Sequence, residues 1–191
     1  MRERRLTAIV QTMCVVGAVS GVSGFTQSNT LGRVNAVREY VAENAIPNGP
    51  VDVPGNVVAP SYRPLIRLML ERSATFRRQC LRIGNTPDLL ITLHRSDAAS
   101  PWTRALARIA RAANGTLLAA IEVVGREDLV ELIAHEFEHV IEQLDGVDLP
   151  ARARLASTGV SRGSGEANAF ETVRARRVGL IVSAEVRNSG N

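Results

Sequence analysis

Apolar positions along the chain follow two periods, one typical of helices and one typical of strands. A spacing of three to four residues predicts a short amphipathic helix at residues 31–45. The same spacing marks residues 64–84 as one helix with a break or as two helices, because Ser73 has a side chain that favours a helix N-cap. Two longer helices are expected at residues 126–146 and 166–186.

Other segments are rich in β-branched residues or flank a turn signal, and these predict strands. One strand is expected at residues 88–94. Residues 106–113 and 116–124 flank Asn114 and Gly115, a dipeptide that favours a hairpin turn, so these two strands should pair. The chain shows no internal repeat. The expected fold class is α+β, with a small mixed or antiparallel sheet and helices that follow it.

The first 24 residues have the layout of an export signal. A basic start precedes an apolar run from Leu6 to Val19, and Ala18, Val19 and Ser20 form a small-x-small pattern. We expect a signal peptide at residues 1–24, a mature chain that begins between about residues 21 and 27, and an exported protein, periplasmic or secreted. The alternative is an uncleaved membrane anchor, for which the apolar run is shorter than the ~20 residues that a spanning helix needs.

The remainder has the composition of one globular domain. Of the 191 residues, 45% are apolar and 22% are charged, which excludes a disordered chain. Residues 25–60 are expected to hold the first helix and a proline-rich connector, and residues 61–191 the domain itself. The net charge is +4, but the basic residues do not form a stripe with aromatic residues between them. No nucleic-acid partner is therefore expected. Loss of the signal peptide would leave Cys80 alone, without a disulfide partner.

Two of the three histidines lie four residues apart in "IAHEFEHV", residues 133–140. On a helix, His135 and His139 project side by side on a face away from the main apolar stripe, so both imidazoles can bind one metal ion. Glu136 lies at the flank of the same face, where it can reach a water on that metal. Two nitrogen ligands, a base and open coordination positions are the requirements of a hydrolytic metal site.

The pentapeptide "HEFEH" resembles the H-E-x-x-H motif of the zincin metallopeptidases. The resemblance implies Zn²⁺ held by His135 and His139, Glu136 as the general base, and a hairpin packed on the motif helix. It also implies hydrolysis of a peptide or protein substrate, whose extended backbone would pair with the strand at residues 116–124. No histidine follows His139, so the third ligand is expected to be a carboxylate on the last helix, as in the gluzincins.

Glu171 and Glu166 are the two candidates for this third ligand. On a helix, Glu171 shares a face with small and apolar residues, where an unpaired carboxylate is costly. Glu166 lies at the helix start, where the helix dipole favours any carboxylate. The burial contrast favours Glu171.

A second and weaker resemblance spans residues 62–186 and also favours Glu171. It is to uncharacterised bacterial exported proteins with a zincin-like core, and it rests on "RSATFR", "IAHEFEHVIEQ" and "AFETVRARRVG…AEV". It brings no known substrate. A non-catalytic zincin-like metal-binding module and an envelope interaction protein are the alternatives to a metallopeptidase.

Overall fold

The structure is a computed structural model and describes residues 11–16, 51–96, 103–125, 127–163 and 169–190. The helix expected at residues 31–45 and the alternative ligand Glu166 lie outside these residues. In chain order, the described elements are β1 Gln11–Val16, β2 Val57–Val58, α2 Arg63–Arg72, α3 Ala74–Gly84, β3 Leu89–Ser96, β4 Thr103–Arg111, β5 Leu117–Val124, α4 Leu129–Leu144, α5 Leu149–Arg152, β6 Val160–Arg162, β7 Ala169–Thr172 and α6 Val173–Asn188.

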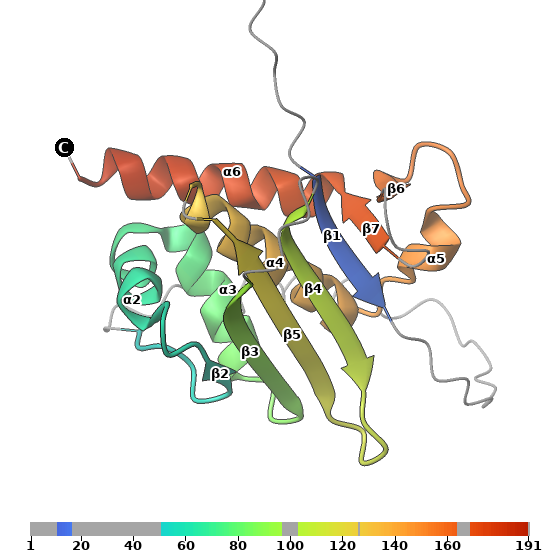
Figure 1. The fold of residues 1–191 in the computed structure, drawn as a ribbon, viewed down its shortest axis with the longest axis horizontal. Coiled ribbons are helices and arrows are strands. Elements are labelled where there is room, and N and C mark those ends of the chain that lie inside the picture. Colours follow the sequence, from blue (N-terminus) through green and yellow to red (C-terminus); the bar gives the residue numbers. More distant parts are fainter. Residues whose placement is uncertain (1–10, 17–50, 97–102, 126, 164–168, 191) are drawn as a thin grey trace, which may run out of the picture.

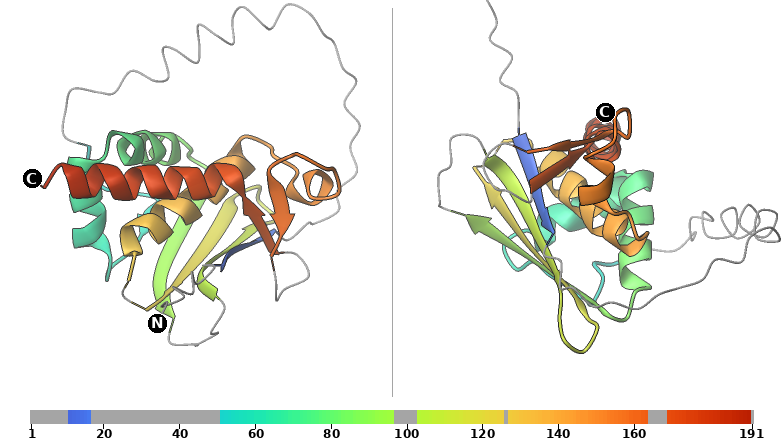
Figure 2. Two further views of the ribbon diagram at one scale, coloured as in Figure 1. Left: turned by 90° about the horizontal axis from the view of Figure 1, so that it is seen from above. Right: turned by 90° about the vertical axis from the view of Figure 1, so that its right-hand side faces the viewer.

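The strands form one mixed sheet in the order β2-β3-β5-β4-β1-β7-β6 (Figure 1). Three neighbouring pairs, β2–β3, β3–β5 and β1–β4, are parallel. The pairs β4–β5, β1–β7 and β6–β7 are antiparallel. The helices pack on one face of this sheet (Figure 2), and the apolar core lies between the two layers. The expected α+β class with a mixed sheet is confirmed.

Ser73 divides the helical segment at residues 64–84 into α2 and α3. Its hydroxyl oxygen accepts a hydrogen bond from the backbone N–H of Phe76 at 2.9 Å and so caps α3. The same hydroxyl donates to the carboxylate of Glu185 on α6, and Thr75 donates to that carboxylate through both its backbone N–H and its hydroxyl. These bonds fix the junction of α2 and α3 to the C-terminal helix.

The hairpin predicted at Asn114 and Gly115 joins β4 to β5. Gly115 has a φ of +92°, which glycine adopts without the steric cost of a Cβ atom. β5 lies inside the sheet, because β3 pairs with its other edge. The expected pairing of residues 116–124 with a substrate backbone is therefore wrong, since both edges of this strand already have partners.

The segment expected to be one helix at residues 166–186 changes structure at Thr172. Residues before it form β7, which pairs with β1 and β6, and α6 begins at Val173. The hydroxyl of Thr172 accepts from the backbone N–H of Ala175 at 2.9 Å and caps α6. The prediction of one helix was wrong, because strand partners distant in sequence outweigh the helix propensity of these residues. Glu171 accordingly lies on a strand.

Two segments that precede the predicted domain boundary belong to the sheet. β2 lies in the proline-rich connector and pairs with β3, and Val53, Val57 and Ala59 are buried in the core. β1 lies within the predicted signal peptide, whose cleavage stays a prediction. Among the described residues, no helix is both long enough and apolar enough to cross a membrane.

Candidate metal centre

The candidate site is built on α4, the most deeply buried of the described helices. All residues from Leu132 to Glu142 are buried, because the helix contacts β4 and β5 on one side and α3 and α6 on others (Figure 1). A helix enclosed in this way has no solvent-facing side on which polar residues could be hydrated. Each polar side chain in its middle turns therefore needs a partner or a ligand.

His135, His139 and Glu171 converge beside this helix. The Nε2 atoms of the two imidazoles lie 3.1 Å apart, and Nε2 of His135 lies 3.3 Å from Oε1 of Glu171. One ligand atom from each of the three residues fits within 4.8 Å of the others, and all three side chains are buried. The structure thus brings together the two histidines of the motif and the carboxylate favoured as their partner.

Glu171 reaches the histidines from β7 and not from a helix. The strand ends at Thr172, and the backbone N–H of Thr172 donates to Oε1 of Glu171 at 3.1 Å. The helix face predicted for Glu171 therefore does not exist, although the structure does bring its carboxylate close to the two histidines. The position of the carboxylate is set by the point where β7 becomes α6.

Burial holds His135 in the form that a metal requires. It lowers the pKa of this imidazole below its ordinary value, although the hydrogen bond to Glu171 acts in the opposite direction. The neighbouring His139 lowers the pKa further. A histidine ligates a metal as the neutral imidazole, so its environment favours the ligating form.

Glu142 contacts the imidazole of His139 through the ring nitrogen Nδ1. Its Oε2 lies 2.9 Å from Nδ1 of His139, and its Oε1 accepts from the hydroxyl of Thr172 at 2.8 Å. With both oxygens of Glu142 facing donors, we assign the imidazole proton to Nδ1. Nε2 of His139, which faces the other ligands, is then free to bind a metal, and this carboxylate–histidine arrangement is common at metal sites.

Glu136 is buried close to the proposed ligands. Its exposed fraction is 0%, and neither carboxylate oxygen accepts a hydrogen bond of normal geometry from the described residues. Burial raises the pKa of this carboxyl well above its usual range, and the charge of Glu171 raises it further, whereas a weak hydrogen bond from the main chain of Ala107 on β4 lowers it. An unpartnered carboxyl in a native core calls for a function or a ligand.

Glu138, the other glutamate of the octet, has a structural role. Its Oε2 accepts from the side-chain amide of Gln79 on α3 at 2.8 Å, and its Oε1 accepts from Arg174 on α6 at 2.6 Å. Arg174 also binds Asp145 at the end of α4. Glu138 therefore connects three helices, and both of its oxygens are engaged by these partners.

Gly179 allows α6 to cross α4 at close range. A Cβ atom at this position would lie 2.8 Å from the backbone oxygen of Glu131 and 3.3 Å from Cβ of His135. The first of these distances is shorter than real Cβ contacts, and backbone atoms do not move aside cheaply. The glycine therefore determines how closely the two helices approach next to a proposed ligand.

Sequence reasoning missed Glu142, Thr172 and Gly179. The position of Glu142 could have been recognised in the sequence, because a carboxylate three residues after a ligating histidine lies on the same side of a helix. Thr172 and Gly179 had none, because their roles depend on a strand-to-helix junction and a helix crossing that no local pattern shows.

No family model, curated protein or solved structure matches this chain. What the site is able to do must therefore be argued from its own geometry. The donor set fits a metal ion on two grounds: two nitrogens and one carboxylate converge, and an unpartnered buried carboxyl adjoins them.

Proposed function

We propose that the protein is a zinc-dependent metallopeptidase in which His135, His139 and Glu171 hold the metal and Glu136 is the general base. One observation carries the proposal. The three buried ligand groups converge next to a fully buried glutamate that has no hydrogen-bond partner among the described residues. A site that only held a structural metal would have no use for this extra carboxyl.

Zinc is the metal that this donor set suits best. Two imidazole nitrogens and one carboxylate leave a coordination position open, as is typical of catalytic zinc sites, whereas closed structural sites have four protein ligands. A Zn²⁺ ion held here would lower the pKa of a coordinated water toward ~7 and would polarise a peptide carbonyl.

The protein's own residues supply the remaining steps. Glu136 would accept a proton from the attacking water and deliver it to the leaving amine, because among the described residues neither of its oxygens accepts a hydrogen bond of normal geometry. A bound cation would also stabilise the ionised form of this carboxyl, which burial alone disfavours. Glu142 would keep the imidazole of His139 in one orientation throughout.

Peptide or protein is the proposed substrate class, and export to the periplasm or the exterior is the proposed location. The first follows from the resemblance to zincins and the second from the pattern at residues 1–24. A zincin-like relationship is part of the proposal, supported by the motif, the buried triad and the mixed sheet beside the motif helix.

The test is to purify the protein with its metal and to compare it with Glu136→Gln. The variant should keep its zinc and lose roughly 10²–10⁴-fold in the rate of peptide hydrolysis, the usual contribution of a general base. A chelator should abolish wild-type activity, and added Zn²⁺ should restore it. A zinc-loaded wild-type protein that cleaves no peptide from a diverse library would favour the non-catalytic metal-binding module instead.

A further inference from the structure

β1 connects two parts of the sheet that do not otherwise pair. On one side lies the group β2-β3-β5-β4, and on the other the pair β7-β6 (Figure 1). β1 runs parallel to β4 with a register from Gln11↔Thr103 to Val16↔Ile109, and antiparallel to β7 through Cys14↔Phe170 and Val15↔Ala169. Chain segments from opposite ends of the sequence therefore meet at this strand.

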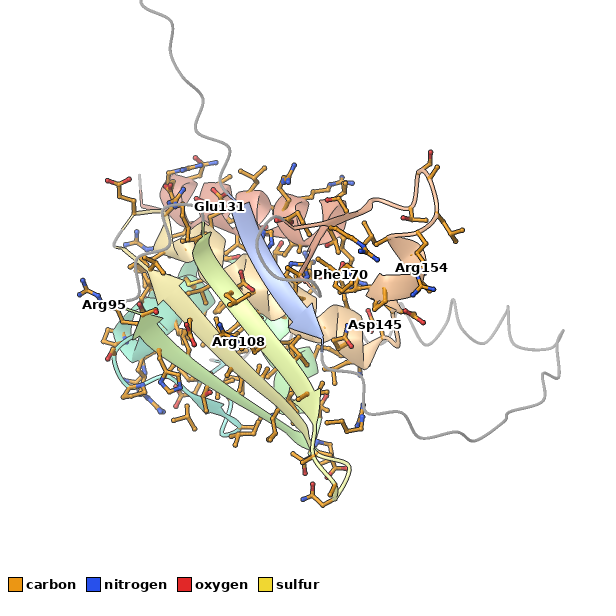
Figure 3. The ribbon with its side chains drawn as sticks, turned by 45° about the vertical axis from the view of Figure 1, so that its right-hand side comes forward. Arg95, Arg108, Glu131, Asp145, Arg154 and Phe170 are labelled. Atoms are coloured by element: carbon orange, nitrogen blue, oxygen red, sulfur yellow. The ribbon has the colours of Figure 1, made fainter. Side chains whose placement is uncertain are left out.

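The position of β1 is next to the candidate metal centre. Its partner on β7 is Phe170, the residue directly before the proposed ligand Glu171. Figure 3 labels Phe170 on β7 beside β1. On the other side, β4 contacts α4, the helix that carries the two histidines, and β1 contacts α4 as well. A peptide backbone in this position passes alongside the proposed ligands.

The two strands on either side of β1, β4 and β7, are each held in place by other contacts. β4 is paired with β5 from Ala105 to Arg111. β7 is held by its pairing with β6, by the bond from Thr172 to Glu142, and by the bond from the backbone N–H of Val173 to the carbonyl oxygen of Gly159. None of these contacts involves β1, so removing that strand would leave a slot with two unpaired edges.

We propose that this slot accepts an extended peptide, and that Gln11–Val16 fills it as a tethered competitor until the N-terminal segment is removed. The inference rests on the function proposed above. The same six residues fall within the predicted signal peptide, and cleavage between about residues 21 and 27 would separate them from the domain. Processing on export would then also open the site.

Tethering explains how a short strand keeps the slot closed. A segment that belongs to the same chain meets the slot at an effective concentration of roughly millimolar, so a free peptide at a much lower concentration cannot displace it. In the processed chain the same peptide meets two free strand edges and gains their backbone hydrogen bonds. The full-length chain should therefore bind peptides more weakly than a chain with a loosened β1.

The test compares two proline variants of the full-length protein. Val15→Pro removes an N–H inside β1, at a residue paired on both sides, whereas Gln11→Pro alters the first residue of the strand, where proline is tolerated. The probe is a fluorescently labelled peptide with the sequence of residues 9–18, and its binding is followed by fluorescence anisotropy. Zinc content and melting temperature are measured on the same samples.

Val15→Pro should bind the probe about tenfold or more tightly than the wild type or Gln11→Pro, with zinc content unchanged. Tighter binding without any peptide hydrolysis would support the slot and contradict the metallopeptidase proposal. Unchanged probe affinity would overturn the inference. Loss of zinc or of folding in Val15→Pro alone would also overturn it, because β1 would then be a structural strand.

Discussion

Glu142 and Thr172 control a single imidazole through two successive hydrogen bonds. The hydroxyl of Thr172 donates to one oxygen of Glu142, and the other oxygen lies 2.9 Å from Nδ1 of His139. Thr172 also follows Glu171 directly and donates its backbone N–H to that carboxylate. One residue thus helps to position two of the three proposed ligands, which makes metal affinity sensitive to a side chain that touches no metal.

Thr172→Val should weaken zinc binding by roughly 10–100-fold, the usual effect of removing such an outer hydrogen bond at a metal site. It also removes the cap of α6, at a cost of about 1 kcal/mol in the free energy of unfolding. Thr172→Ser keeps the hydroxyl and serves as the matched control. Competition with a chromogenic chelator measures the zinc affinities. Equal affinities for the two variants would show that the hydroxyl of Thr172 does not influence zinc binding.

Replacing zinc with Co²⁺ allows the effect of Glu142 on the ligand His139 to be followed in the visible spectrum of the metal. Glu142→Gln retains an oxygen that can accept from the imidazole but loses the negative charge, so the visible spectrum of bound Co²⁺ should shift while folding is kept. Glu142→Ala should lose the metal more severely than Glu142→Gln. Identical spectra for the wild type and both variants would show that the carboxylate has no influence on the ligand.

At the scale of elements, the crossing of α4 and α6 depends on Gly179. Gly179→Ala should destabilise the protein by about 1–3 kcal/mol, the usual cost of forcing an extra methyl group into a packed interface. Because the methyl group would press on the turn that carries His135, zinc affinity should fall as well.

Gly84→Ala is the matched control for this prediction. Gly84 ends α3, and a Cβ atom there would meet only Pro54 at 3.5 Å, an ordinary contact distance. Denaturant unfolding of both variants measures the difference. If Gly179→Ala proved as stable as Gly84→Ala, the helices would have room to separate and the close crossing would not matter.

Glu185 links α6 to the start of α3 and makes this contact dependent on pH. Burial raises the pKa of its carboxyl, but the hydrogen bonds from Ser73 and Thr75 outweigh burial and bring the pKa below its ordinary value. A carboxyl with a lowered pKa stabilises the fold above its unfolded pKa of about 4.3, and this stability disappears as the pH falls through the folded pKa.

The melting temperature of the wild type should therefore decline between about pH 5 and pH 3 more steeply than that of Glu185→Gln, which has no carboxyl to protonate. At pH 7 the variant should be the less stable of the two. Parallel pH profiles would indicate that the three hydrogen bonds contribute equally in the neutral and the ionised form.

At the scale of the whole molecule, the features that could be predicted are those encoded within one segment. The cap at Ser73, the hairpin at Gly115 and the pairing of His135 with His139 on one helix each follow from a few neighbouring residues. The α+β class follows from their sum. Glu171 was proposed because no histidine follows His139, so that the third ligand was expected to be a carboxylate, and because this carboxylate was expected to be buried.

What could not be predicted depends on contacts between distant segments. β7 forms because residues near position 170 pair with β1 and β6. The spacing of apolar residues in this segment is typical of a helix, so the sequence did not predict the strand. β2 joins the sheet through a proline-rich stretch that looks like a linker. Residues 116–124, the strand expected to pair with a substrate backbone, form β5 inside the sheet, whereas β1 lies between β4 and β7.

The central claim is that the fold assembles one metal centre from α4 and β7. It is tested most directly by the zinc content of the purified protein, measured by inductively coupled plasma mass spectrometry on the wild type, Glu171→Ala and Glu166→Ala. The account predicts about one zinc per chain in the wild type and in Glu166→Ala, because three protein ligands are needed to hold it, and almost none in Glu171→Ala. Full zinc content in Glu171→Ala, or its loss in Glu166→Ala, would contradict the account.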